Sequence, residues 1–146
     1  MDKPPENSKF MRTIAMAILI GCWSGCDSSQ VATYSVSGRL EFADGEPVRT
    51  GTIELESQEF GTTATGTIRE DGTFVLGTYT PNDGAAAGEH RVIVVQIIVG
   101  DGISTHSLDH GRPVPMHFAS YESSPLTVHI APIEDNVIVI TLPDSQ

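Results

Sequence analysis

The stretch YSVSGRLEF, residues 34–42, sets the fold class, because hydrophobic and polar residues alternate along it. Its even positions carry Tyr34, Val36, Leu40 and Phe42 around one glycine, and its odd positions carry serine, arginine and glutamate. A period of two residues is that of a β-strand with one apolar side and one side facing water. We therefore expect residues 34–42 to form a strand that packs its even positions against a core.

Six further segments with strand character follow, separated by turn sequences such as Asp44-Gly45 and Asp71-Gly72. Glycine tolerates the positive φ that tight turns need, so these pairs mark strand ends. The expected strands are residues 34–42, 52–56, 64–69, 73–79, 90–99, 126–130 and 137–142. We find no convincing amphipathic helix between them. Seven short strands with regular turn signals predict an all-β, antiparallel β-sandwich.

Two of the expected strands are apolar on both faces, at residues 92–99 and 137–140. The outer face of an antiparallel sandwich usually meets water, so a second apolar face needs a cover. The cover is either residues 100–124 folded back over the strand or another protein, which includes a second copy of this chain. A central strand that its own chain covers needs no partner. The residues that we assign to a possible interaction surface are Val94, Ile97, Val99, Pro113 and Pro115.

The amino-terminal segment has the layout of a bacterial lipoprotein signal. Lys9 and Arg12 precede an apolar run at residues 14–20, which is too short for a membrane span of about 20 residues. The run leads into the sequence LIGC, which resembles the bacterial lipobox and ends at Cys22. We expect cleavage before Cys22 and diacylation of its thiol. Lipidation at Cys26, or no lipidation, is the alternative.

These features divide the chain into three parts. Residues 1–21 are the expected signal peptide, residues 22–33 a lipidated cysteine with its tether, and residues 34–143 the β-sandwich domain. The expected location is the cell envelope, on the extracytoplasmic side of a membrane that holds the lipid.

Charge excludes one class of partner. The chain has a formal net charge of −11, and all basic residues after position 21 are scattered arginines. Nucleic-acid binding needs a basic stripe that neutralises phosphates, so we expect no nucleic-acid partner. An anionic membrane would also repel the domain, so membrane attachment has to come from the lipid.

The order and spacing of the motifs resemble carboxypeptidase regulatory-like domains of small bacterial lipoproteins. The opening match is GRLEF, DGEPV and GTI at residues 38–42, 44–48 and 51–53. The match continues with DGTFVL, GEHRV, VPMHF and SPLTV at residues 71–76, 88–92, 114–118 and 124–128. The resemblance implies a transthyretin-like (prealbumin-like) Greek-key sandwich of seven strands. Its members are generally uncharacterised, so it implies an envelope setting but no activity.

Catalytic and metal-binding signals are weak. His106, His110 and His117 lie in a segment rich in glycine and proline, so helical spacing cannot bring them together on one face. The chain has no Gly-x-Ser-x-Gly elbow and no phosphate-binding glycine loop. We therefore expect no enzyme, no metal site and no cofactor. The expected function is a structural or protein-interaction module of the cell envelope, and the alternative is a module that binds calcium or a glycan.

Overall fold

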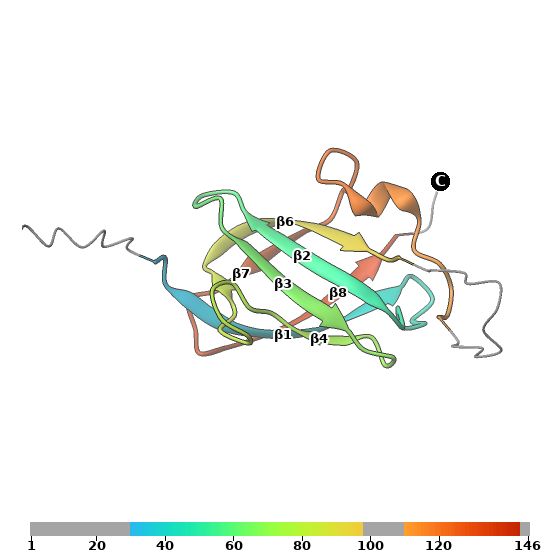
Figure 1. The fold of residues 1–146 in the computed structure, drawn as a ribbon, viewed down its shortest axis with the longest axis horizontal. Helices are drawn as coiled ribbons and strands as arrows, with labels where there is room; N and C mark the ends of the chain where they lie inside the picture. Colours follow the sequence, from blue (N-terminus) through green and yellow to red (C-terminus); the bar gives the residue numbers. More distant parts are fainter. Residues whose placement is uncertain (1–29, 98–109, 144–146) are drawn as a thin grey trace, which may run out of the picture.

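Two four-stranded β-sheets pack face to face in the computed structural model, which describes residues 30–97 and 110–143 (Figure 1). The elements are β1 (Thr33–Phe42), β2 (Gly51–Ser57), β3 (Thr63–Ile68), β4 (Thr73–Val75), β5 (Ala85–Ala86), β6 (Gly88–Val95), the 3₁₀ turn η1 (Met116–Ala119), β7 (Thr127–Ile130) and β8 (Asp135–Leu142). The all-β sandwich expected from the alternating pattern is therefore confirmed. Among the described residues, no helix is long and apolar enough to cross a membrane.

The first sheet is built around β1, which lies between β4 and β8 and also pairs with β5. The second sheet has the order β3-β2-β6-β7, and all of its pairs are antiparallel. Two details differ from the expected seven antiparallel strands. The β1–β8 pair is parallel, in register from Ser35 with Asp135 to Phe42 with Leu142. The described residues also form eight strands, because the chain after β4 makes a further two-residue strand, β5.

Strand limits follow the sequence closely except at three places, one of which is β8, which begins at Asp135 rather than at residue 137. The strand expected over residues 73–79 ends at Val75, because Gly77 forms an isolated bridge with Thr65 of β3 and the chain then bends at residues 78–80. The strand expected over residues 90–99 begins two residues earlier, at Gly88, and its described pairing ends at Val95. Residues 98 and 99 lie outside the described residues.

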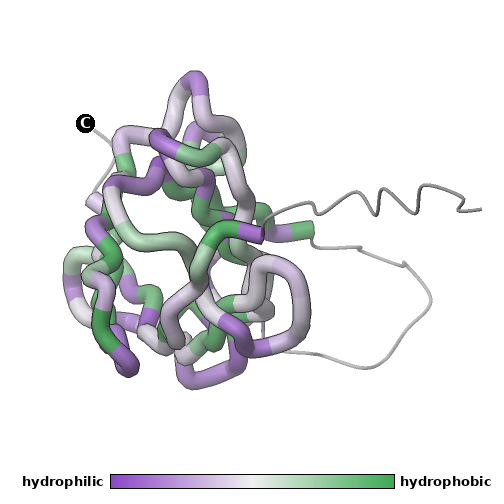
Figure 2. Tube along the Cα trace, turned by 90° about the vertical axis from the view of Figure 1, so that its left-hand side faces the viewer, coloured by the Kyte–Doolittle hydropathy of each residue, from purple (hydrophilic) through white to green (hydrophobic). Residues whose placement is uncertain are grey.

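The core lies between the two sheets, and strand alternation selects its residues. Val36, Leu40 and Phe42 of β1 point inward and are buried, as the even positions of the deciding stretch predict. They pack with Ile53 and Leu55 of β2 in one hydrophobic cluster that includes residues from both sheets. Figure 2 shows hydrophobic and hydrophilic residues alternating along the chain, viewed from the end at which β1 begins. Burial of these side chains supplies the main stabilising free energy.

One tight turn, between β4 and β5, is held by Asp83. Its carboxylate accepts backbone N–H groups from Thr78, Tyr79 and Thr80 at 2.6, 3.0 and 2.9 Å. Partial burial raises the pKa of Asp83, but these hydrogen bonds outweigh it and leave the pKa below its ordinary value. Gly84 follows with a φ of 85°, and a Cβ there would lie 1.7 Å from a backbone oxygen. The turn therefore needs both the aspartate and the glycine.

Candidate functional site

The outer face of β6, one of the two doubly apolar segments, is covered by the chain itself. Ile93 faces outward from β6 and is 8% exposed. Its register partner on β2 is Glu54, whose Oε1 accepts a hydrogen bond from the Tyr121 hydroxyl at 2.8 Å. The guanidinium of Arg91, two residues before Ile93, lies 5.0 Å from the centroid of the Tyr121 ring. The segment after η1 thus folds back over β6, which is one of the two covers that the sequence allowed.

Tyr121 acts there as a neutral hydrogen-bond donor. Burial raises the pKa of Tyr121, and the hydrogen bond to Glu54 raises it further. Arg91 also forms an ion pair with Glu56, which lies beside Glu54 on the outer face of β2. The contact of Arg91 with the Tyr121 ring and the charge-assisted hydrogen bond from Tyr121 to Glu54 therefore hold the covering segment to the sheet, and the ion pair with Glu56 fixes Arg91 on it.

The residues predicted for the interaction surface are not brought together by the fold. Val94 is 1% exposed and belongs to the core, so a partner cannot reach it, and its assignment to a surface was wrong. Ile97 is exposed just beyond the end of β6. Pro113 is exposed and Pro115 half-buried, in the segment before η1. Val99 lies outside the described residues.

Pro113 and Pro115 line a small cleft of about 180 Å³ with Phe42, Phe118 and Leu142. Phe42, Phe118 and Leu142 are almost fully buried, so the cleft is the rim of the core. Arg112 also lines the cleft and lies over the ring of Phe42. Its guanidinium lies 3.6 Å from the centroid of the Phe42 ring and donates two hydrogen bonds of 3.1 Å to the Asp44 carboxylate. These contacts pack residues 112–115 against the sandwich, and the cleft that remains leaves little room for a ligand.

The outer face of β8 is the doubly apolar segment that stays uncovered within the described residues. Val137 is 79% exposed and Val139 is 62% exposed, whereas Ile140 on the inner face is buried. The neighbouring outward residues on β1 are Ser37 and Arg39, so the two valines stand at the margin of a polar sheet. No side chain from the rest of the described chain covers them as Tyr121 covers β6.

β8 is also an edge strand in the described part of the chain, since β1 is the strand recorded beside it. An edge strand presents unpaired N–H and C=O groups, and proteins usually guard such edges with charge, proline or a cover. Residues 136–142 carry no charge and no proline. The sequence contained the signal for this site, the apolar run at 137–140, but the predicted interaction surface lay on the segment around and after the end of β6 and in the segment before η1.

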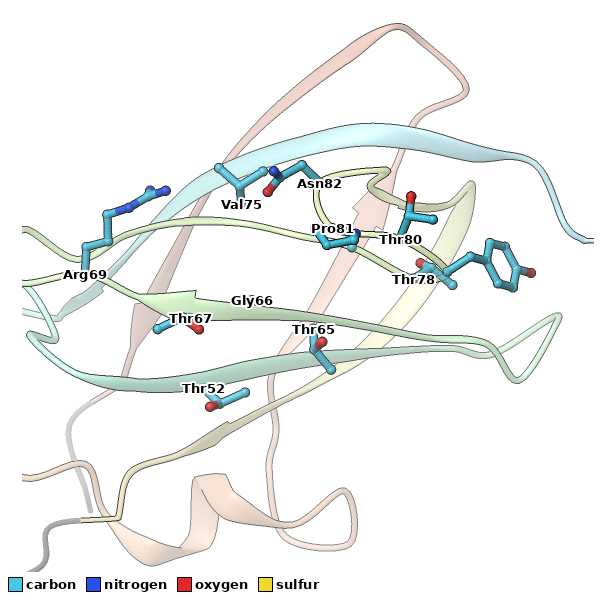
Figure 3. Close-up of a pocket in the computed structure, with 12 residues that line it drawn as sticks. Thr52, Thr65, Gly66, Thr67, Arg69, Val75, Thr78, Thr80, Pro81 and Asn82 are labelled. Carbon is cyan, nitrogen blue, oxygen red and sulfur yellow. The ribbon is translucent and has the colours of Figure 1, made fainter.

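A second concave feature lies between β3 and β4, which belong to different sheets (Figure 3). An isolated bridge joins Thr65 to Gly77, and a cleft of about 520 Å³ opens along this seam. Hydroxyl, amide and guanidinium groups line it, from Thr52, Thr65, Thr67, Thr78, Thr80, Asn82 and Arg69. None of the lining residues is acidic, in a chain with a formal charge of −11. The cleft suits a polar ligand rich in hydroxyl groups.

The described residues contain no group of three or more histidine, cysteine, aspartate or glutamate side chains placed to hold a metal ion. His110 and His117 lie on either side of Arg112 in the described chain, while His106 lies outside it. Cys22, the predicted lipidation site, also lies outside the described residues.

No protein-family model matches the chain, and no curated protein matches it. Among solved structures, the crystal structure of a 9R-lipoxygenase from Cyanothece PCC8801 is similar to it, with a TM-score of 0.40 and 15% sequence identity. The similarity covers 77% of this chain and 16% of the lipoxygenase chain. A similarity this weak carries no argument about activity, so nothing is transferred from the lipoxygenase.

Proposed function

We propose that the protein is a non-catalytic lipoprotein of the bacterial cell envelope that works as an interaction module. Cys22 carries the lipid in this proposal, and the contact surface is the free edge and outer face of β8. The observation that carries it is the exposure of Val137 and Val139 on an edge strand whose residues 136–142 carry no charge. The resemblance to carboxypeptidase regulatory-like domains belongs to the proposal and is supported by the two-sheet fold.

The partner we propose is a second copy of the same chain, paired edge to edge through β8. The rest of the protein is strongly acidic, so copies repel each other over most of their surface. Residues 136–142 are the exception, because they carry no charge and offer free backbone groups. Antiparallel pairing of two β8 strands satisfies those groups and buries the valines of both copies. Confinement to one membrane raises the effective concentration and favours the pair.

Cysteine cross-linking in the native membrane tests whether two copies of the chain pair through β8. Val137→Cys, Val139→Cys and Thr141→Cys are made singly in a Cys26→Ser background, and oxidation is followed on non-reducing gels. Antiparallel strands related by a two-fold axis bring equivalent residues together near that axis, within disulfide reach. We expect a disulfide dimer that is strongest at one of the three positions. Met116→Cys, exposed on η1, is the matched control and should stay monomeric.

An adduct of a different mass at these positions would identify another envelope protein as the partner and overturn the second-copy proposal. Absence of any adduct, with the β8 variants folded and in the membrane, would overturn β8 as the contact surface.

Intact-mass analysis of the protein from its membrane fraction tests the anchor separately. A chain that begins at Cys22 and carries acyl chains is the expected result. An unmodified chain in the soluble fraction would contradict the anchor and leave the β8 proposal standing.

A second candidate function is binding of an oligosaccharide in the cleft between β3 and β4. The observation that favours it is the lining of hydroxyl, amide and guanidinium groups without a carboxylate. Calorimetry with neutral and uronic-acid oligosaccharides tests it, using Thr67→Val to remove one hydroxyl and Thr127→Val on β7 as the control. Binding that weakens at Thr67 and not at Thr127 supports this function, and absence of heat with every sugar contradicts it.

A further inference from the structure

One end of the sandwich gathers exposed apolar side chains from three separate loops. Phe60 lies in the turn between β2 and β3, Tyr79 in the loop between β4 and β5, and Ile133 in the turn between β7 and β8. All three side chains are more than a third exposed. Single exposed apolar residues need no explanation, but a cluster on three loops at one end does.

Strand pairing places these loops at the end of the molecule where β1 begins, which we call the proximal end. Thr33 at the start of β1 pairs with Ala86, just before β6 begins. The backbone N–H of Gln58, in the Phe60 turn, donates to the Glu89 carbonyl oxygen at 3.0 Å. Asp135, next to the Ile133 turn, is in register with Ser35 of β1. Figure 1 shows the three loops grouped around the start of β1, and Figure 2 looks onto this end.

The chain that leads to the proposed lipid leaves from the same end. The Tyr79 hydroxyl accepts a hydrogen bond from the Val31 N–H at 3.0 Å, so Val31 is fixed to one of the three loops. Val31 follows Cys22 by nine positions, a reach of about 30 Å when fully extended. A lipid at Cys22 therefore keeps Val31, and the proximal end to which it is bonded, within about 30 Å of the bilayer surface.

The charged residues at the proximal end indicate whether it would contact an anionic or a zwitterionic bilayer. Glu59 and Glu134 are exposed beside Phe60 and Ile133, and Asp135 is exposed at the start of β8. Nδ1 of His129 lies 2.8 Å from the carboxylate of Glu89, so this pair adds no net positive charge that would offset them. Acidic groups at the interface are repelled by anionic lipid and tolerated by zwitterionic lipid. Apolar and aromatic side chains favour the interfacial region of either kind.

We propose that the proximal end is a membrane-contact surface, in which Phe60, Tyr79 and Ile133 insert into the interfacial region of a zwitterionic bilayer. This inference rests on the lipid anchor of the proposed function. It fixes the orientation of the sandwich, with β1 and β8 running away from the membrane. It applies to the unpaired molecule, because an antiparallel β8 pair would hold the proximal ends of its two copies at opposite ends of the dimer.

Tryptophan quenching by brominated phosphatidylcholine tests the orientation. The natural tryptophan, Trp23, is replaced by phenylalanine, and Phe60→Trp, Ile133→Trp or Met116→Trp is added to the full chain. Each protein is purified from its membrane fraction and reconstituted in phosphatidylcholine vesicles, and flotation of the vesicles reports the anchor. We expect emission from Phe60→Trp and Ile133→Trp to shift to shorter wavelength and lose intensity in brominated lipid. Met116→Trp, exposed on η1 away from the proximal end, should do neither.

Flotation without quenching at positions 60 and 133 would overturn the membrane-contact surface while the anchor stands. Equal quenching at all three positions would also overturn it, because the sandwich would then have no fixed orientation. Failure to float would show instead that the anchor is absent. The same variants, with Cys26→Ser, are then coupled through the Cys22 thiol to maleimide-bearing phosphatidylcholine vesicles, where quenching decides the orientation in the same way. Added anionic lipid should reduce the quenching at position 60.

Discussion

The side-chain amide of Asn136 donates a hydrogen bond to the carbonyl oxygen of Ser35 at 3.3 Å, and this bond joins the starts of β8 and β1. The same amide nitrogen also donates to the Ala131 carbonyl at 3.1 Å, and the amide oxygen accepts the Ala131 N–H at 3.0 Å. One buried side chain thus closes the turn between β7 and β8 and fixes β8 beside β1.

Replacing Asn136 with alanine should destabilise the fold by about 1–3 kcal/mol, because the Ala131 backbone groups lose buried partners. The measurement is the free energy of unfolding from urea titration. Thr141→Ala, at an exposed position of the same strand, is the control and should change stability little. Equal effects of the two variants would contradict the role given to the amide.

Gly84→Ala should be far more damaging than Gly45→Ala, although both residues have a φ of 85°. The backbone strain is shared and costs about 1 kcal/mol in each variant. A Cβ at Gly84 meets the Tyr34 oxygen at 1.7 Å, whereas a Cβ at Gly45 meets nothing within 4 Å. We expect the additional cost at Gly84 to be about 2–3 kcal/mol or more, measured by thermal unfolding. Similar melting temperatures would show that the β4–β5 loop can move away from β1.

His90 should make the fold less stable as the pH falls below about 6.5. Burial lowers the pKa of His90 from its ordinary value of 6.5, while the Gly88 carbonyl and Glu89 raise it and His129 lowers it. The unfolded chain therefore takes up the proton first, and stability falls with pH until the folded-state pKa is reached. The slope is at most about 1.4 kcal/mol per pH unit for one group.

His90→Gln removes this group, so the loss of stability between pH 7 and pH 5 should shrink relative to the natural protein. Urea titrations at several pH values measure it, and His110→Gln, which removes a histidine that does not shift the His90 pKa, serves as the control. An unchanged pH dependence in His90→Gln would mean that other groups account for the acid sensitivity.

Val94→Asp and Ile97→Asp should separate core from surface on the β6 segment. An aspartate at position 94 is buried without a partner, so we expect loss of the folded state, a cost of about 4 kcal/mol or more. The exposed position 97 should tolerate the change within about 0.5 kcal/mol. Circular dichroism and thermal unfolding distinguish the two. A folded Val94→Asp variant would contradict the placement of Val94 in the core and would support a contact surface on this part of β6.

Much of the sandwich could be predicted from the sequence because its strands are amphipathic. Alternation along residues 34–42 correctly placed Val36, Leu40 and Phe42 in the core, and the Asp-Gly pairs marked turns. Local patterns carry no information on which strands meet, however. The parallel pairing of β1 with β8 joins residues about one hundred positions apart, and nothing within either strand announces it. The strand β5 was missed because two alanines are too short a pattern.

The candidate site was harder to predict for the same reason. Two apolar runs looked alike in sequence, and only the tertiary contact of Tyr121 with Glu54 shows that β6 is the covered one. Val137 and Val139 then become the exposed pair. Two of the threonines that line the cleft between β3 and β4 alternate visibly at residues 65 and 67, but the cleft depends on the separation of two strands into different sheets.

The parallel β1–β8 ladder also determines how the protein bears mechanical load. The chain enters β1 at Thr33 and leaves β8 at Leu142, at opposite ends of eight paired positions. Tension between these points runs along both strands and shears their hydrogen bonds together, and forced unfolding follows the height of that barrier. Tension between Gly88 and Ile130, an antiparallel pair at one end of its ladder, peels bonds apart one after another. In a single-molecule pulling experiment the first geometry should rupture at a much higher force than the second. When the start of β1 and the end of β8 are pulled apart, the domain should therefore resist extension.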